Sequence, residues 1–196
     1  MDGVIGAAFV TGTFLILNQW YTNHQKKLEA IKKPDLADTD YGDLIEPILE
    51  HIRDTVGAHR VFYLAAQNGE KTLDGYSIKK LSMMAESNAD GVDNIIRDIQ
   101  GLPTAVFRRC ITSLKDSDQG FFVSHESELN DQLARINTAH GIQTQLCIQV
   151  FNIKHGKKWT GILCVSFEEK QRTVHPTEIG SVELQVGRIE SLISKL

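Results

Sequence analysis

Two neighbouring segments in the second half of the chain constrain its fold more than any other part of the sequence. Residues 142–153 read IQTQLCIQVFNI and residues 159–169 read WTGILCVSFEE, with the turn sequence KHGKK between them. In the first segment Leu146, Ile148 and Val150 point to one face and the residues between them to the other, as in a strand. Two such runs joined by a glycine-containing turn predict an antiparallel hairpin.

The segments around this hairpin alternate between helical and extended patterns. We expect helices over 40–60, 91–100, 104–114, 126–141 and from Pro176 onward, and strands over 60–69, 76–86 and 120–125. This order predicts an α+β fold with a central antiparallel sheet flanked by the N- and C-terminal helices on one face. The predicted organisation is a transmembrane anchor over 1–23, a charged helix or linker over 24–41, and one domain over 42–196.

The anchor is predicted from an uncharged run. Residues 3–21 are just long enough to cross a bilayer, which takes about 20 helical residues, and Trp20 and Tyr21 suit the membrane interface. Lysines follow this span, so the positive-inside rule predicts a single-pass protein with its N-terminus outside and the domain in the cytoplasm. A cleaved signal and a buried soluble helix are alternatives; Asp2 and the absence of a cleavage site disfavour the first.

Two patterns predict a homodimer. Gly3, Ala7 and Thr11 recur every four residues, a spacing that lets membrane helices approach closely. The last helix, from Ile179 to Leu196, repeats its apolar residues with heptad spacing. The alternatives are that small residues are simply common in such spans and that the last helix packs only on its own domain.

Several classes of function are disfavoured by the composition. The formal net charge is −4 and no basic stripe is present, so we expect no nucleic-acid partner. The seven histidines show no metal-binding spacing, and phosphate-binding and nucleophile-elbow motifs are absent. We therefore expect no metal, identify no cofactor and assign no catalytic residue.

Three cysteines leave a second function open. Cys110, Cys147 and Cys164 form no framework pattern, which favours a reducing compartment and structural roles. Cys147 and Cys164 fall in the two strands of the hairpin and are expected near one another, whereas Cys110 follows two arginines that could lower the pKa of its thiol. The lysines of the turn 154–158 either contact anionic lipid or only keep the turn in water.

The order of elements resembles that of a GAF-type (GAF/PAS-like) sensory domain over about residues 42–195. The likeness rests on DLIEPILEHIRDTVGAHRVFYLAAQNG, GLPTAVFRRCITSL, GFFVSH, the hairpin with its G-x-L return strand, and HPTEIGSVELQVGRIESLI. The resemblance implies that the terminal helices form a dimer bundle and that the middle helices and the sheet enclose a small-molecule pocket. The Asn-Lys-x-Phe-Asp-Glu motif of cyclic-nucleotide-binding members is absent, and a bilin-bearing cysteine cannot be assigned.

The uncharged N-terminal span, the order of elements and the heptad of the last helix together favour a non-enzymatic, membrane-anchored, GAF-like module that binds an unidentified small molecule or a protein partner and dimerises. The candidate pocket residues are Tyr63, Ser82, Glu86, Phe107 and Phe121. Two alternatives remain. One is a thiol-based redox enzyme similar to the free methionine sulfoxide reductases, working through its cysteines. The other is a structural or regulatory interaction protein of the kind that bacteria and their phages encode.

Overall fold

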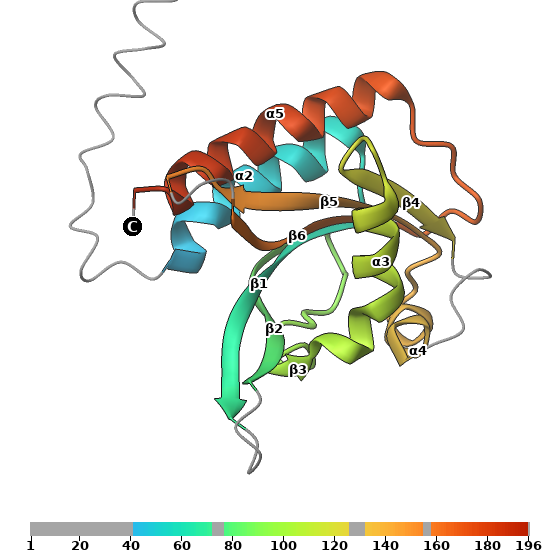
Figure 1. Cartoon of the computed structure of the whole chain (residues 1–196). Helices are drawn as coiled ribbons and strands as arrows, with labels where there is room; N and C mark the ends of the chain where they lie inside the picture. The colour runs from blue at the N-terminus through green and yellow to red at the C-terminus, as the bar shows by residue number, and fades with distance from the viewer. Residues whose placement is uncertain (1–40, 72–76, 126–131, 155–157, 196) are drawn as a thin grey trace, which may run out of the picture. The chain divides into compact units, whose positions relative to one another are not determined.

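The computed structural model describes residues 41–71, 77–125, 132–154 and 158–195, which form one curled sheet with helices on both faces (Figure 1). The elements follow in the order α2 (Tyr41–Val56), β1 (Arg60–Lys71), β2 (Ser77–Asn88), β3 (Leu102–Pro103), the 3-10 helix η1 (Thr104–Phe107), α3 (Arg108–Asp116), β4 (Phe121–His125), α4 (Gln132–Ala139), β5 (Thr144–Asn152), β6 (Lys158–Phe167) and α5 (Pro176–Ile193). This order confirms the predicted α+β class.

The sheet has six strands in the order β3-β2-β1-β6-β5-β4, and every neighbouring pair is antiparallel. The predicted hairpin is confirmed: β5 and β6 pair from Thr144 opposite Phe167 to Asn152 opposite Lys158. The first and last strands of the domain, β1 and β6, lie side by side at its centre. Strands from the start and the end of the domain therefore pair in the middle of the sheet.

Helices α2 and α5 pack together on one face of the sheet, here called the outer face (Figure 1). The alternation predicted for β5 is confirmed, because Leu146, Ile148 and Val150 all belong to the core beneath these helices. Together with side chains such as Ile52 and Ile189 they are nearly inaccessible to water. Burial of this apolar surface is what fixes the helices on the sheet.

Helix α5 begins where the proline predicted, at Pro176. The carboxylate of Glu178 accepts a hydrogen bond of 2.8 Å from the backbone N–H of His175 and lies 2.6 Å from the guanidinium of Arg172. A carboxylate in the first turn is favourable because it faces the positive end of the helix dipole. This arrangement fixes the start of the helix relative to the loop that precedes it.

Two predictions about elements differ from the structure. Residues 91–100 form turns and not the predicted helix. The carboxylate of Glu86 binds the backbone of this segment, and the amide of Gln100 donates to the carbonyls of Ile96 and of Met83 in β2, which holds the segment against β2. Strand β2, predicted over 76–86, extends to Asn88. The predicted anchor over 1–23 and linker up to residue 40 lie outside the described residues. Within the described ranges, no helix has the length and apolar character needed to cross a bilayer.

Candidate functional site

The second face of the sheet, here called the inner face, is covered by the loop 89–101, η1, α3 and α4. Its buried residues are Phe62, Leu64, Leu81, Met83, Ile95, Ile99, Val106, Phe107, Cys110, Leu114, Leu133, Ile142, Cys147, Ile162 and Cys164. Side chains fill the centre of this face; Phe107, for example, is 1% exposed. A ligand that reached the centre would therefore have to displace packed side chains.

The margin of the inner face is more open than its centre. Partly buried apolar side chains pack there against the core: Ala66, Ile96, Leu102, Ile111, Phe122, Ile136 and Trp159. Trp159 starts the exposed end of β6 and pairs with Phe151 of β5, so the two aromatic residues are neighbours across the hairpin. An apolar margin with a half-buried tryptophan is suited to hold the apolar part of a small molecule.

Glu86 holds the loop 89–101 in place over the inner face. Its carboxylate, 7% exposed, accepts hydrogen bonds of 3.0 and 3.2 Å from the backbone N–H of Ile95 and one of 3.2 Å from that of Ile96. Buried polar groups are stable only when they are paired, and here the carboxylate and two amides satisfy one another. Glu86 therefore holds the loop that closes one side of this face.

Arg60 lies beside Glu86 and is 1% exposed. Its side chain donates to Asn88 Oδ1 at 2.8 Å and to the carbonyl of Asp93 at 2.6 Å, while its Nη1 has no hydrogen-bond partner within the described part of the chain. Burial lowers the pKa of Arg60, and the carboxylates of Glu86 and Asp93 raise it again in part. Glu86 therefore also offsets part of the cost of burying a guanidinium.

The three cysteines meet at the centre of the inner face. Cys147 and Cys164 face each other directly across β5 and β6 with their sulfurs 3.7 Å apart, so their predicted proximity is confirmed. A hydrogen bond from Cys110 lowers the pKa of Cys147, but contact with Cys164 and burial raise the pKa well above its usual range. Burial also raises the pKa of Cys164. These two thiols are therefore protonated and shielded at neutral pH.

We expect all three thiols to be unreactive in the folded protein, because each is at most 2% exposed. With an aromatic disulfide reagent, colour should develop slowly in native buffer and to three thiols per chain in denaturant. A rapid reaction of one thiol in native buffer, lost in Cys110→Ser and accompanied by reduction of free methionine sulfoxide, would contradict the structural role and favour the redox enzyme.

The five residues proposed from the resemblance do not converge on one pocket. Phe107 lies in the core of the inner face, and Glu86 binds the loop 89–101 that covers this face. Ser82 accepts a hydrogen bond of 2.8 Å from the backbone N–H of Gly101 and so positions the segment leading to β3. Tyr63 and Phe121 instead pack on the outer core beneath α2 and α5. The sequence does not show this, because Tyr63 follows Phe62 and only the strand register decides which of them faces inward.

Tyr63 is 1% exposed and lies against Gly161 of the neighbouring strand. Burial raises the pKa of Tyr63 to about 12, with a hydrogen bond to Thr160 acting in the opposite direction and the carboxylate of Glu190 adding to the rise. The unfolded chain ionises Tyr63 near pH 10, so the folded state resists this ionisation. The free energy of unfolding therefore does not depend on Tyr63 ionisation below pH 10. It falls as the pH rises from 10 to about 12, because only the unfolded chain then releases the proton.

We expect Tyr63→Phe to reduce the fall in the free energy of unfolding at alkaline pH. The variant should start less stable at pH 8, because it lacks the hydroxyl that pairs with Thr160. Between pH 10 and 12 it should then lose about 2–3 kcal/mol less than the wild type does. Urea unfolding at a series of pH values measures this difference, and parallel profiles for the two proteins would contradict the assigned environment.

The residues that the sequence did not indicate are Arg60 and Trp159. Arg60 is the first residue of β1, and an arginine there gives no signal that it is buried, because arginine is mostly exposed in proteins. Trp159 opens a strand beside a lysine-rich turn, and its position at the margin of the inner face depends on where β5 and β6 pair. Only the bulge between Val150 and Phe151 brings Phe151 opposite Trp159.

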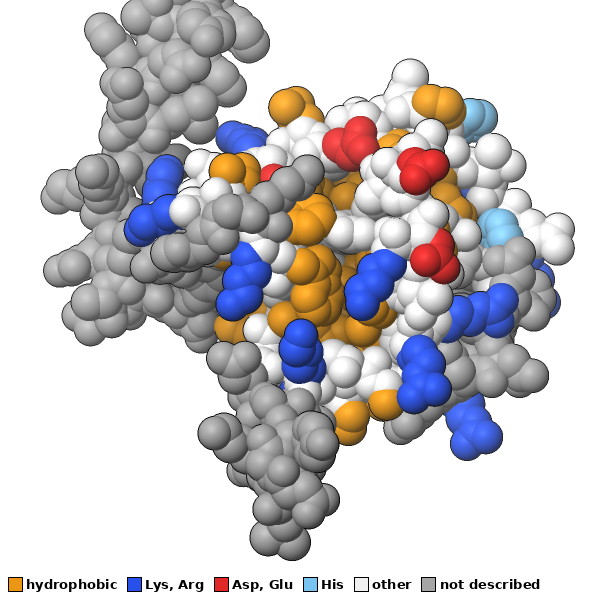
Figure 2. Space-filling view, in the orientation of Figure 1, with side chains coloured by type: hydrophobic (Ala, Val, Ile, Leu, Met, Phe, Trp, Pro, Cys, Tyr) orange, Lys and Arg blue, Asp and Glu red, His pale blue; other side chains and the backbone are white. Residues whose placement is uncertain are grey.

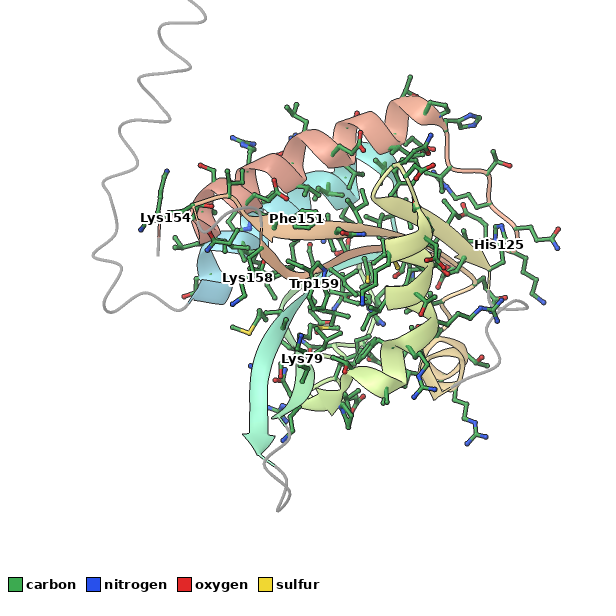
Figure 3. All side chains as sticks on the ribbon, in the orientation of Figure 1. Lys79, His125, Phe151, Lys154, Lys158 and Trp159 are labelled. Carbon is green, nitrogen blue, oxygen red and sulfur yellow. The ribbon has the colours of Figure 1, made fainter. Side chains whose placement is uncertain are left out.

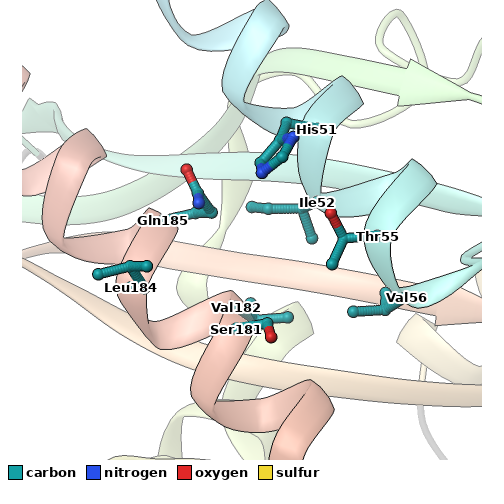
Figure 4. Close-up of a pocket in the computed structure, with 8 residues that line it drawn as sticks. All are labelled: His51, Ile52, Thr55, Val56, Ser181, Val182, Leu184 and Gln185. Carbon is teal, nitrogen blue, oxygen red and sulfur yellow. The ribbon is translucent and has the colours of Figure 1, made fainter. Parts of the chain in front are cut away.

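The outer surface of the helix pair carries a shallow groove (Figure 4). The groove has a volume of about 140 Å³ and is lined by His51, Ile52, Thr55, Val56, Ser181, Val182, Leu184 and Gln185. Leu184, at the edge of the groove, is 70% exposed. The groove is therefore formed by the facing sides of α2 and α5.

Within the described ranges, no three side chains of His, Cys, Asp or Glu are arranged to hold a metal ion. No protein-family model matches the sequence, and no curated protein is similar to it. Solved structures do match.

One is the phycocyanobilin-bound GAF domain of a cyanobacterial phytochrome, at 16% identity and a TM-score of 0.59, covering 87% of this chain and 93% of that one. Another is a far-red cyanobacteriochrome photoreceptor, at 13% identity and a TM-score of 0.61, covering 90% and 98%. A third is the blue-light absorbing form of the GAF domain of Thermosynechococcus elongatus PixJ, at 13% identity and a TM-score of 0.60, covering 84% and 90%. With its six-stranded antiparallel sheet and its packed terminal helices, this chain has the GAF fold.

Proposed function

We propose that the protein is a membrane-anchored, non-enzymatic sensory module that binds a small molecule or a protein partner and dimerises through its terminal helices. The observation that carries ligand binding is the inner face, where a filled apolar core is bordered by half-buried side chains including Trp159. The ligand that suits this margin is a small molecule with an apolar body. The GAF domains of similar fold include one that is bilin-bound, which supports a ligand on this fold.

Native mass spectrometry of the full chain, released from detergent micelles, tests ligand and stoichiometry together. We expect a dimer that retains a small organic molecule, and Trp159→Ala should lose that molecule while remaining folded. Since Trp159 is only partly buried, its removal should leave the sheet intact. A ligand-free protein from its native membrane, or one whose ligand survives Trp159→Ala, would contradict the proposed site.

Dimerisation is supported by the groove between α2 and α5. Leu184 projects from α5 at the edge of this groove, and burying one leucine side chain stabilises an interface by about 1.5–3 kcal/mol. Leu184→Glu should therefore weaken the dimer at least tenfold in sedimentation measurements. The matched control is Ile153→Glu, which replaces another large apolar residue of the described chain that is 58% exposed and lies outside this groove. Equal weakening by both variants would contradict a dimer at this surface.

The anchor proposal rests on the uncharged segment over 3–21. Washing membranes with alkaline carbonate should leave the full chain in the pellet, because such treatment removes only peripheral proteins. Replacing two residues at the middle of this span, Val10 and Leu15, with aspartate should release it. Full recovery of the wild-type chain in the supernatant would refute the anchor without affecting the assignment of the inner face.

A further inference from the structure

One end of the sheet collects lysines from three separate segments. Because neighbouring strands are antiparallel, β2 and β6 begin at the same end at which β1 and β5 finish. Lys79 and Lys80 come from the start of β2, Lys158 from the start of β6, and Lys154 directly after β5. Lys79, Lys154 and Lys158 are exposed. Four cations are thus gathered at one end of a chain whose formal charge is −4.

Apolar side chains stand among these lysines. Phe151 and Trp159 are paired and partly exposed, and Ile153 is 58% exposed. Figure 3 labels Trp159 near the middle of the view with Lys158 beside it and Lys79 below it. We call the set Lys79, Lys80, Phe151, Ile153, Lys154, Lys158 and Trp159 the lysine-aromatic end.

Among the described side chains, the carboxylates at this end come from Glu190 and from the start of α2. Glu190 is held in place, because its Oε1 accepts a hydrogen bond of 2.9 Å from the backbone N–H of Phe151. Asp43 and Glu46 belong to the first turns of α2. In Figure 2, blue side chains border an orange apolar strip, and the red ones in this view lie above the strip and to its right. Among the described residues, this surface therefore places lysines next to apolar side chains.

The chain enters the domain at this same end. The second half of α2 lies against the first half of α5 in the groove, so the two helices are antiparallel. The end of α5 is tied to the end of β5, because Asn152 Nδ2 donates to the carbonyl of Ile193 at 3.4 Å and the N–H of Ile153 to Ser194 Oγ at 3.0 Å. Helix α2 therefore starts, at Tyr41, beside the lysine-aromatic end, and residues 1–40 join the domain there.

We propose that the lysine-aromatic end docks on the anionic surface of a lipid bilayer. Exposed tryptophan, phenylalanine and isoleucine side chains suit the interfacial region, and lysines beside them are attracted to anionic headgroups. Each lysine near such a surface strengthens binding about fivefold. The contact goes beyond the anchor, since it orients the domain on the leaflet and does not depend on residues 3–21 crossing it.

The test uses the full chain in vesicles of phosphatidylcholine alone or mixed with phosphatidylserine. Ile153→Cys carries a fluorescent label, and the native thiols are buried and should stay unlabelled. With phosphatidylserine present, a lipid-borne quencher should reach the label while aqueous iodide should not, and high salt should reverse this protection. In phosphatidylcholine alone, iodide should reach the label.

Charge reversal identifies the residues responsible. Lys154→Glu combined with Lys158→Glu should abolish the protection, since removing two contacts alone weakens docking roughly 25-fold. The matched control is Arg135→Glu with Lys170→Glu, which makes the same charge change at exposed positions on α4 and after β6 and should leave protection intact. Equal loss in both pairs, or equal quenching in both lipids, overturns the proposal, and the second result favours an acidic protein partner.

The same experiment separates docking from the anchor. If residues 3–21 do not span the bilayer, the chain stays in the supernatant with phosphatidylcholine vesicles. It should still bind phosphatidylserine vesicles in a manner that needs Lys154 and Lys158. Sedimentation with the neutral vesicles therefore reports on the anchor, and dependence on these two lysines reports on docking.

Discussion

Replacing Gly161 with alanine should lower the free energy of unfolding by about 3 kcal/mol or more, the upper range for overpacking a core. An added Cβ would lie 2.1 Å from the carbonyl oxygen of Leu64 and 2.8 Å from the ring of Tyr63. The first of these contacts is with backbone in the centre of the sheet, so it cannot be relieved by turning a side chain. The strands β1 and β6 must therefore separate locally, and the ring of Tyr63 must shift as well.

Urea unfolding monitored by circular dichroism measures this loss, with Gly180→Ala as the matched control. Gly180 lies within α5, and nothing outside the backbone of its own helix lies within 4 Å of the place that a Cβ would take. The same substitution should therefore stabilise the protein by about 0.5–1 kcal/mol, because glycine is the weaker helix former. A Gly161→Ala protein as stable as the wild type would show that β6 does not approach Tyr63 as described.

Replacing Glu86 with alanine should destabilise the protein by about 2–4 kcal/mol. The change leaves the buried backbone N–H of Ile95 without its acceptor, which costs about 1–3 kcal/mol, and removes one of the two acceptors of the Ile96 N–H, which keeps Asn94 Oδ1 at 3.0 Å. It also removes a negative charge near the buried guanidinium of Arg60. The loop 89–101 should loosen first, so hydrogen exchange at Ile95 and Ile96 should accelerate more than exchange in β1 or β6.

Glu86→Gln grades this effect, because the amide keeps one acceptor oxygen but loses the charge. Its loss of stability should fall between the wild type and Glu86→Ala. Glu183→Ala removes an exposed carboxylate from α5 and should change stability by no more than about 0.5 kcal/mol. If Glu86→Ala changed the stability no more than Glu183→Ala does, the carboxylate of Glu86 would not hold the loop 89–101 in place.

The architecture could be predicted because its strongest signals are local. The period-two pattern around Cys147, the glycine-containing turn and the proline at residue 176 each determine an element without knowledge of the rest of the chain. Pairing partners were harder to predict, since β1 and β6 are far apart in sequence and yet adjacent in the sheet. The helix expected over 91–100 was wrong because the side chains of Glu86 in β2 and Gln100 in the loop bind the backbone of this segment, a tertiary effect that outweighs local preference.

The candidate site was less predictable than the fold. Whether Tyr63 faces inward or outward depends on register, and the bulge at Phe151 that places it opposite Trp159 leaves no mark in the sequence. The cysteine pair was predictable because both thiols sit in strands joined by one short turn. The GAF resemblance predicted the layers correctly. It assigned all five candidates to one pocket, whereas the structure places Tyr63 and Phe121 on the opposite face of the sheet.

The hydrogen bonds of Glu190, Asn152 and Ser194 join the end of α5 to the end of β5. They make the helix and this strand end one mechanical part. A rotation of α5 against the sheet must either carry the Phe151–Trp159 pair with it or break all three bonds. A displacement of Trp159 by a bound molecule is therefore transmitted to α5, which carries Leu184, through these hydrogen bonds. It does not have to pass through the packed centre of the domain.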